Sequence, residues 1–247
     1  MKLDHTLITL DVDWASDELI RRCAATLIDH DVKATWLITH ASAAVEELRA
    51  RDDLFELGIH PNFHAGSTQG DTPEAVIDHL LEIVPGARTV RTHDLFQSTR
   101  LLRMMLQRGI DHDLSLLLPD VAGIAPHDFH LPEGVLRRFP TFWEDDAEML
   151  CPEPSFSLAD PKYHVEGLKI FTFHPILVAL NAHTLEPYQR LKQCHSMATL
   201  GPADLAPWVQ DGEGNGTFFR ALAEHIASGD AGASLTVVEL ARLANSR

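Results

Sequence analysis

Strand-length apolar runs alternate with helical patterns along this chain, and this alternation restricts the fold more than any other feature. Residues 6–10 form an apolar, β-branched run of strand length. Apolar residues then recur at helical spacing over residues 19–28, with Ser16 placed as a helix N-cap. A chain that repeats this order is typical of parallel βα units, so we expect an α/β fold.

The same order continues to the C-terminal part of the chain. Further strands are predicted over residues 33–39, 55–59, 89–91, 114–118, 135–139 and 168–173, and further helices over residues 42–49, 73–82, 98–107, 218–226 and 238–243. Residues 201–216, rich in proline and glycine, are predicted to form a long surface loop. The 247 residues fit one catalytic domain over 1–247, an ordinary size for a β/α barrel.

Charge and cysteine content limit the partners and the compartment. The formal net charge of −16 opposes binding to nucleic acid or to an anionic membrane surface. The first residues have no charged lead and no long apolar core, and no apolar run reaches the length of a membrane span. The three scattered cysteines are typical of a reducing compartment. We therefore expect a cytoplasmic protein without a secretory signal or an integral membrane segment.

Acids and histidines follow two of the predicted strands. Asp11 and Asp13 lie at the carboxyl end of the first strand, where α/β folds collect their chemistry. His60 and His64 follow the strand over residues 55–59. Pro61 suits the first position of a helical turn that would bring both histidines onto one face. Asp13, His60 and His64 are predicted to hold a hydrolytic divalent metal ion, which leaves Asp11 free to act as a base.

Two later strands also end at residues that can carry chemistry. Arg91 ends the short strand over 89–91 and would pair with Asp11, holding it ionised. His174 follows the strand over 168–173 and could donate a proton to a departing amine. An acid usually positions such a histidine. The candidates are the cluster over residues 143–146 and the pair Asp111 and Asp113, among which Asp145 is favoured.

Structural interpretations compete with each of these assignments. About one pair of histidines at this spacing is expected by chance among 15 histidines in 247 residues, so the acids must support the metal prediction. An Asp-x-Asp motif after a strand is also common as a turn and helix cap. Arg91 could serve in a structural ion pair, and His174 could be a packed core residue.

Five segments, in this order, resemble the polysaccharide deacetylase family (NodB-homology, carbohydrate esterase 4-like). They are residues 9–13 (TLDVD), 34–37 (ATWL), 60–64 (HPNFH), Arg91 and residues 171–175 (FTFHP), so the resemblance covers roughly residues 6–180. It implies a distorted seven-stranded (β/α) barrel and metal-dependent removal of acetyl or formyl groups from amino sugars. It also implies that Asp11 is the base and His174 the acid. The form Asp-Val-Asp is similar to the intracellular deformylase-type and surface-polysaccharide biosynthesis branches.

The chain departs from the family pattern at two points. Thr92, His93 and Asp94 stand where a proline and an aromatic residue commonly follow the arginine, and Pro61 stands where a hydroxyl residue is usual. His93, His183 and Asn181 could line the pocket, but spacing gives them no role. Three aromatic residues could stack on a sugar ring, although aromatic residues more commonly pack in the protein core. They are Phe142, Trp143 and Trp208.

Together these observations predict a metal-dependent deacylase that acts on an N-acetyl or N-formyl amino sugar, nucleotide-linked or lipid-linked, during surface-polysaccharide (lipopolysaccharide) assembly. The expected cofactor is one divalent metal ion, zinc before cobalt, manganese, iron or nickel. Two alternatives stay open: a hydrolase of small non-sugar amides on the same barrel, and a catalytically silent carbohydrate-binding relative. The sequence leaves open the sugar, the acyl group and the oligomeric state.

Overall fold

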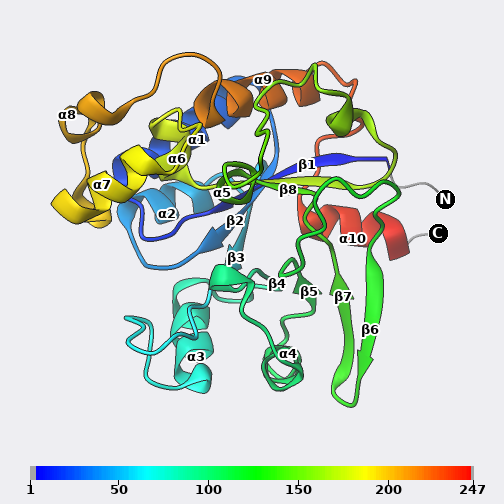
Figure 1. Cartoon of the computed structure of the whole chain (residues 1–247). Coiled ribbons are helices and arrows are strands. Elements are labelled where there is room, and N and C mark those ends of the chain that lie inside the picture. Colours follow the sequence, from blue (N-terminus) through cyan, green and yellow to red (C-terminus); the bar gives the residue numbers. More distant parts are fainter. Residues whose placement is uncertain (1–3, 246–247) are drawn as a thin grey trace.

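A curled mixed sheet forms the centre of the molecule (Figure 1). The structure, a computed structural model, describes residues 4–245. Within these residues nine strands pair in the order β6-β7-β5-β4-β3-β2-β1-β9-β8. The strands are β1 (Thr6–Asp11), β2 (Ala34–Ile38), β3 (Phe55–Ile59), β4 (Thr89–Val90), β5 (His112–Asp113), β6 (His127–Leu131), β7 (Gly134–Arg138), β8 (Trp143–Glu144) and β9 (Lys169–Phe173). Neighbouring strands are parallel except in the β6–β7 hairpin.

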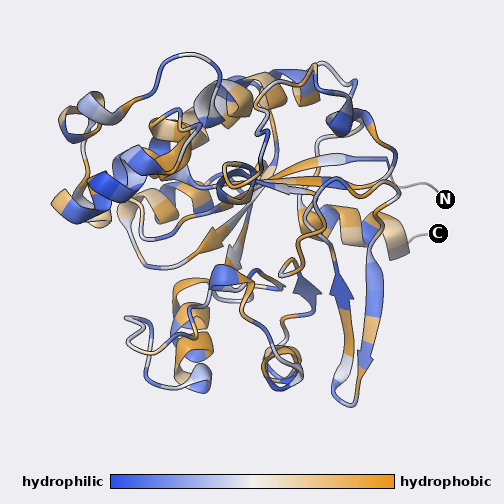
Figure 2. Cartoon of the chain, in the orientation of Figure 1, coloured by the Kyte–Doolittle hydropathy of each residue, from blue (hydrophilic) through white to orange (hydrophobic). Residues whose placement is uncertain are grey.

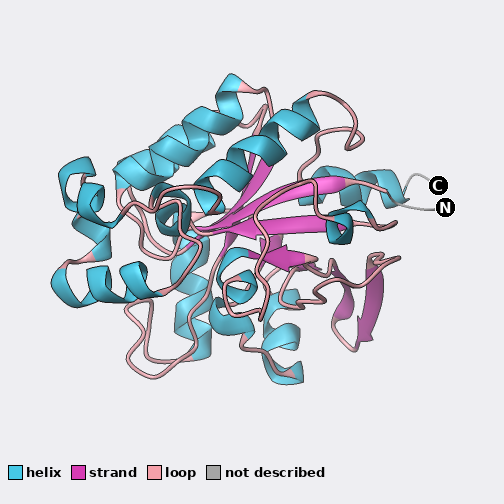
Figure 3. Cartoon of the chain, turned by 45° about the horizontal axis from the view of Figure 1, so that its top comes forward, coloured by secondary structure: helices cyan, strands magenta, loops and turns pink. Residues whose placement is uncertain are grey.

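Helices surround the strands (Figure 3). They are α1 (Asp17–Asp29), α2 (Ala43–Arg49), α3 (Pro73–Ile83), α4 (Thr99–Leu106), α5 (Asp145–Glu148), α6 (Pro175–Ala179), α7 (Glu186–Cys194), α8 (Pro202–Leu205), α9 (Asn215–Ala227) and α10 (Val237–Asn245). Helices α1, α2, α6 and α9 form one packed group, and α3 contacts α4. Hydrophobic residues concentrate on the central strands and on the helix faces turned toward them, whereas α7 is largely hydrophilic (Figure 2).

Local sequence explains where most of these elements begin. Every residue of β1 and β2 is buried, as expected for strands covered on both faces. Side-chain oxygens of Ser42 and Ser98 accept hydrogen bonds from the backbone N–H groups of Val45 and Leu101, which caps α2 and α4. Ser16 occupies the N-cap position of α1 as predicted, but its hydroxyl donates to Leu200 O (2.7 Å) instead of capping the helix.

The predicted strands over residues 6–10, 33–39, 55–59, 89–91, 135–139 and 168–173 are confirmed to within one or two residues at their ends. The strand predicted over 114–118 is wrong. The strand in this part of the chain is β5, which ends at Asp113, and within 114–118 Leu117 forms only an isolated bridge. Strands β6 and β8 and helices α5, α6 and α7 were not predicted. The predicted loop over residues 201–216 is also partly wrong, since α8 lies within it and α9 begins at its end.

The α/β class is confirmed, but the seven-strand count is not, because nine strands pair within the described residues. Four residues, 139–142, carry the chain from β7 near one edge of the sheet to β8 at the other. Within that link Thr141 bridges to Leu117, and Phe142 N–H donates to Ile170 O (2.9 Å). This link curls the sheet and brings its two sides toward each other. No helix in the described part of the chain is long and apolar enough to cross a membrane.

Candidate functional site

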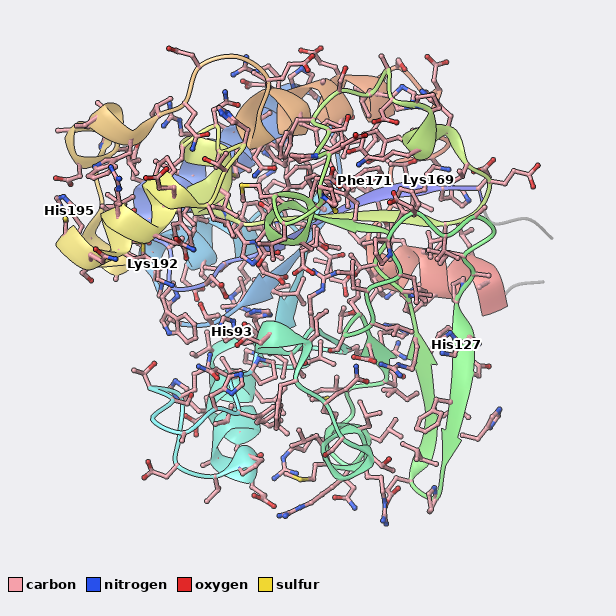
Figure 4. All side chains as sticks on the ribbon, in the orientation of Figure 1. His93, His127, Lys169, Phe171, Lys192 and His195 are labelled. Carbon is pink, nitrogen blue, oxygen red and sulfur yellow. The ribbon has the colours of Figure 1, made fainter. Side chains whose placement is uncertain are left out.

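The predicted site residues follow strands whose carboxyl ends face the same way. Asp11 ends β1, His60 follows β3, and His174 follows β9. Arg91 directly follows β4, and Asp145 directly follows β8. Figure 4 shows His93 and Lys192 toward this side of the molecule, with Lys169, the first residue of β9, toward the opposite side. Parallel pairing therefore gathers residues that are up to 163 positions apart, as between Asp11 and His174.

Asp11 and Arg91 form a fully buried ion pair. Arg91 Nη1 donates to Asp11 Oδ1 (2.9 Å) and to Thr9 Oγ1 (3.0 Å), and Arg91 Nη2 donates to Thr141 Oγ1 (2.7 Å). Arg91 is 0% exposed and Asp11 is 1% exposed. The other carboxylate oxygen, Asp11 Oδ2, lies 3.8 Å from His60 Nδ1. The guanidinium thus fixes one oxygen of Asp11 and leaves the other turned toward the histidine.

Asp13 lies beside two histidines from other strand ends. Its Oδ1 is 3.1 Å from His60 Nε2 and 3.3 Å from His93 Nδ1. Burial alone would raise the pKa of Asp13, but these histidines hold that pKa well below its usual range. Contact with Asp13, opposed by burial, raises the pKa of His93. Asp13, His60 and His93 are one of the groups of described residues whose ligand atoms all lie within 4.8 Å of one another.

The loop that carries His60 and His64 is not helical, which corrects the predicted helical turn. The Nε2 of Gln69 donates to Thr39 O (3.0 Å) and His60 O (3.1 Å), and its Oε1 accepts from Asn62 N–H (2.7 Å). Asn62 Oδ1 in turn accepts from His64 N–H (2.9 Å). These bonds fold the loop without a helix, and His64 does not lie one turn above His60.

His64 lies at the rim of the site. Its Nε2 is 3.0 Å from Asp94 Oδ2, and its side chain is 44% exposed. Its ring centroid is 6.3 Å from that of His93, whereas the His60 and His93 centroids are 5.5 Å apart. Asp13 and His60 are therefore brought together as expected, while His64 pairs with an exposed acid.

His174 is held by Asp145. The ring Nδ1 donates to Asp145 Oδ1 (2.6 Å), and the backbone N–H of His174 donates to Asp145 Oδ2 (2.7 Å). Burial opposes the imidazolium, yet Asp145 raises the pKa of His174 well above its usual range. The free Nε2 lies 3.7 Å from Asp13 Oδ2. Asp145 thus favours the protonated form of His174, next to the group around Asp13.

Asp111 and Asp113, which were also candidates to orient His174, have different partners. Asp113 accepts from Arg138 Nε (2.7 Å), and Asp111 accepts from Arg88 Nε (3.0 Å). Glu144 belongs to the same acidic cluster as Asp145, and burial raises its pKa to about 8. One oxygen of Glu144 lies within 4.8 Å of ligand atoms of Asp11 and His174. Glu144 is therefore close to both predicted proton-transfer groups.

A cavity of about 450 Å³ opens beside Asp13 and His174. Helix α7 and the turn before it form one wall. The lining residues are Asp13, Asp146, His174, Leu177, Leu185, Tyr188, Gln189, Lys192 and Gln193. Lys192 Nζ lies 5.0 Å from the centroid of the Tyr188 ring. The cavity has the size of a small-molecule site, with an apolar body and a few polar groups.

The remaining sequence candidates lie away from this cavity. His183 lines a different hollow with Asp211 and Glu213. Asn181 binds Gln210 O and Gly212 O (both 2.9 Å) and so holds the loop before α9. Phe142 and Trp143 are buried, and Trp143 packs among other aromatic rings. Tyr188, Gln189 and Lys192 had no sequence signal, because α7 is largely hydrophilic and buries only Leu191.

The donors around Asp13 fit a divalent metal ion. Asp13 Oδ1 is buried and accepts no hydrogen bond from any residue within 4–245, although two imidazole nitrogens lie within 3.3 Å of it. Both contacts are short, but neither has the geometry of a hydrogen bond. One carboxylate and imidazole nitrogens form a donor set that zinc and similar ions prefer.

The fold and this site define a class of α/β protein with a buried acid and histidine centre at its strand ends, and the comparisons give its family. The model of the WbmS-like polysaccharide deacetylase family matches residues 8–192. A crystal structure from Bordetella bronchiseptica, proposed to be a polysaccharide deacetylase involved in O-antigen biosynthesis, is 32% identical. That match covers 90% of each chain with a TM-score of 0.79. The chain therefore belongs to the WbmS-like polysaccharide deacetylase family.

A more distant structure supports the fold alone. A protein from Mycobacterium smegmatis, also proposed to be a polysaccharide deacetylase, is 13% identical with a TM-score of 0.62. That match covers 99% of this chain and 91% of the other. A comparison with curated proteins gives no match.

Proposed function

We propose that this protein is a metal-dependent N-deacylase that removes an acetyl or formyl group from an amino sugar during surface-polysaccharide assembly. The observation that carries the proposal is the arrangement around Asp13. A buried pair, Asp11 with Arg91, lies near it, and a second pair, His174 with Asp145, lies beside it. Asp13 and His174 line the same cavity.

Asp11 and His174 supply the proton transfers in this proposal. Amide hydrolysis needs a base for the attacking water and an acid for the leaving amine. Arg91 holds Asp11 Oδ1, which orients the carboxylate and leaves Oδ2 to take the water proton. Asp145 raises the pKa of His174 and so favours its protonated form, whose Nε2 would deliver the proton to the amine. Arg91 and Asp145 act by positioning these two groups.

Asp13 and His60 would hold the metal ion together with a second histidine, for which the sequence predicts His64. A divalent ion bound there, zinc by preference, supplies the Lewis acidity that polarises the amide carbonyl and activates water. The unsatisfied Asp13 Oδ1 and the adjacent imidazole nitrogen support this assignment.

The cavity supports a sugar carried on a phosphate. Its volume of about 450 Å³ is large enough for an amino sugar. A nucleotide-linked or lipid-linked sugar is anionic, and the net charge of −16 would repel it unless a local cation were present. Lys192 on α7 supplies such a cation among the residues that line the cavity. We therefore favour a linked sugar precursor, with the reaction in the cytoplasm.

The two alternatives make different demands on this site. A hydrolase of small non-sugar amides would have no use for the α7 wall with Tyr188 and Lys192. A silent carbohydrate-binding relative would have no need of two fixed pairs aligned for proton transfer. The presence of both features favours the deacylase.

The direct test is metal analysis of the purified protein together with an assay of product release. We expect about one divalent ion per chain, and release of acetate or formate from a nucleotide-linked N-acyl amino sugar that stops when a chelator removes the ion. Release from small amides but from no sugar would support the first alternative. Carbohydrate binding without any release, in metal-loaded protein, would support the second.

A further inference from the structure

We propose that His93 is a metal ligand of this site, completing a shell with Asp13 and His60, and that His64 stays at the rim in its pair with Asp94. The inference rests on the metal-dependent function proposed above and names the residue that completes its metal site. His93 stands where the family pattern has no histidine, and spacing in the sequence gives it no role.

The first observation is the convergence of three donor atoms. The distances from Asp13 Oδ1 to His60 Nε2 and His93 Nδ1 are 3.1 Å and 3.3 Å. In a tetrahedral site with metal–ligand bonds of roughly 2.0–2.2 Å, neighbouring ligand atoms lie about 3.3–3.6 Å apart. Both distances from Asp13 are therefore already close to those between ligands of one ion, and the ligand atoms of the whole group lie within 4.8 Å of one another. Within residues 4–245, Asp13 Oδ1 accepts no hydrogen bond of regular geometry.

The second observation is that strained backbone presents both Asp13 and His93. Asp13 and Trp14 have φ values of 46° and 55°. Behind His93, which begins the 3-10 turn His93–Leu95, Asp94 and Leu95 have φ values of 53° and 52°. Left-handed backbone is disfavoured for Trp and Leu, and such strain persists only where the surroundings determine it, commonly at functional sites.

The surroundings also fix the direction of the His93 ring. The backbone N–H of His93 donates to Pro61 O (3.0 Å), which ties it to the loop that carries His60. The Trp14 ring packs edge-on against His93 with centroids 5.5 Å apart. On the far side of the His93 ring, Nε2 faces Asp94 Oδ1 at 3.7 Å. This separation is beyond hydrogen-bond distance, so the backbone bond and the Trp14 ring are the contacts that hold His93 beside Asp13.

His64 has the opposite surroundings. Its side chain is 44% exposed, and its Nε2 contacts Asp94, which is 64% exposed. Metal binding by His64 would require this pair to separate and the ring to turn inward. His93 needs neither change, so it is the better third donor in this chain.

The test measures metal affinity independently of turnover. Apo protein would be titrated with zinc in competition with a chromophoric chelator, for the wild type and for His93→Ala, His64→Ala and Asp13→Ala. His79→Ala, on the exposed face of α3, serves as a matched control. Circular dichroism of each apo variant checks folding, and His93→Asn replaces His93→Ala if that variant does not fold.

We expect His93→Ala and Asp13→Ala to weaken zinc binding by at least about 100-fold, and His64→Ala and His79→Ala to change it by less than about threefold. Wild-type affinity in His93→Ala, with loss in His64→Ala, would overturn the proposal in favour of the sequence-predicted set. Equal loss in both would support His93 as a ligand and overturn the rim position of His64. A wild type that releases acetate or formate but binds no metal would instead refute the proposed metal dependence.

Discussion

Asp11 and Asp13 are two residues apart, yet the structure gives them different surroundings. Asp11 ends β1, is 1% exposed, and bonds through Oδ1 to the fully buried Arg91. Asp13 lies on left-handed backbone, and its Oδ1 faces His60 and His93 without a hydrogen bond. A carboxylate fixed by an arginine keeps its charge and orientation, whereas one surrounded by imidazole nitrogens can share a metal ion with them. The partners of each aspartate, not its residue type, thus separate the proposed base from the proposed metal ligand.

Neutralising each aspartate in turn tests most directly whether Asp11 and Asp13 have different roles. We expect Asp11→Asn to lower kcat by about 10³-fold or more, because the base is lost, while metal affinity stays within about threefold of the wild type. Asp13→Asn should instead reduce metal content. Steady-state kinetics and elemental analysis of the two proteins provide the measurement. Equal metal loss in both variants would move Asp11 into the metal shell.

The free energy of unfolding should depend strongly on the buried ion pair of Asp11 and only weakly on an exposed ion pair. Arg91→Met leaves Asp11 buried without its partner, so we expect the free energy of unfolding at neutral pH to fall by about 3–5 kcal/mol. Arg100→Met, which removes an exposed pair with Glu74, should change it by less than about 1 kcal/mol. Urea unfolding followed by circular dichroism measures both. Similar small changes in the two variants would mean that the buried pair has little structural importance.

His174, the proposed acid, should matter most for substrates with a poor leaving group. We expect His174→Ala to lower the hydrolysis of ordinary amides by about 10²-fold or more, and to affect an activated ester much less, because an amine needs a proton to leave. Metal content should hardly change. Parallel assays on an amide and an ester of the same acyl group measure the difference. The same proportional loss on both substrates would leave the acid role without support.

The pH profile should respond to Asp145. In the wild type Asp145 raises the pKa of His174 well above its usual range, so we expect the proposed acid to keep its proton to higher pH than a free histidine would. Asp145→Asn removes this stabilisation and lowers the pKa of His174. The alkaline limb of kcat/KM should therefore move to lower pH, while the acidic limb should stay. An unmoved alkaline limb would indicate that another group controls it.

The smallest expected effect lies at the α7 wall. We expect Lys192→Gln to raise KM for a phosphate-linked sugar by about three- to tenfold with little change in kcat, because an exposed charge contributes modestly. Arg190→Gln on the same helix is the matched control, since Arg190 pairs with Glu186 and does not line the cavity. The Lys192 effect should shrink as salt increases. Equal effects of both variants would remove Lys192 from the binding site.

The sequence alone determined the class of the fold and which residues lie at the carboxyl ends of the principal strands. The apolar runs over residues 6–10, 55–59 and 168–173 are local patterns, and their ends carry Asp11, His60 and His174 whatever the tertiary arrangement. The order of the motifs was then enough to predict the family, and the match of the family model to residues 8–192 confirms that prediction. Short or hydrophilic elements lacked such a pattern. β8 has two residues, and α7 buries only Leu191, so neither could be predicted.

Only the tertiary structure decided which of these residues meet. Arg91 reaches Asp11 across 80 positions because the parallel strands between them turn all their carboxyl ends to one side. Asp145, not Asp111 or Asp113, contacts His174 because β8 pairs directly with β9. His93 approaches Asp13 through left-handed backbone at Asp94 and Leu95, which no glycine in the sequence indicates. Residue types and the positions of strands along the chain are local features that the sequence shows directly. Which residues contact each other depends on the order in which the strands pair in the sheet and on backbone strain, and both arise only when distant segments pack together.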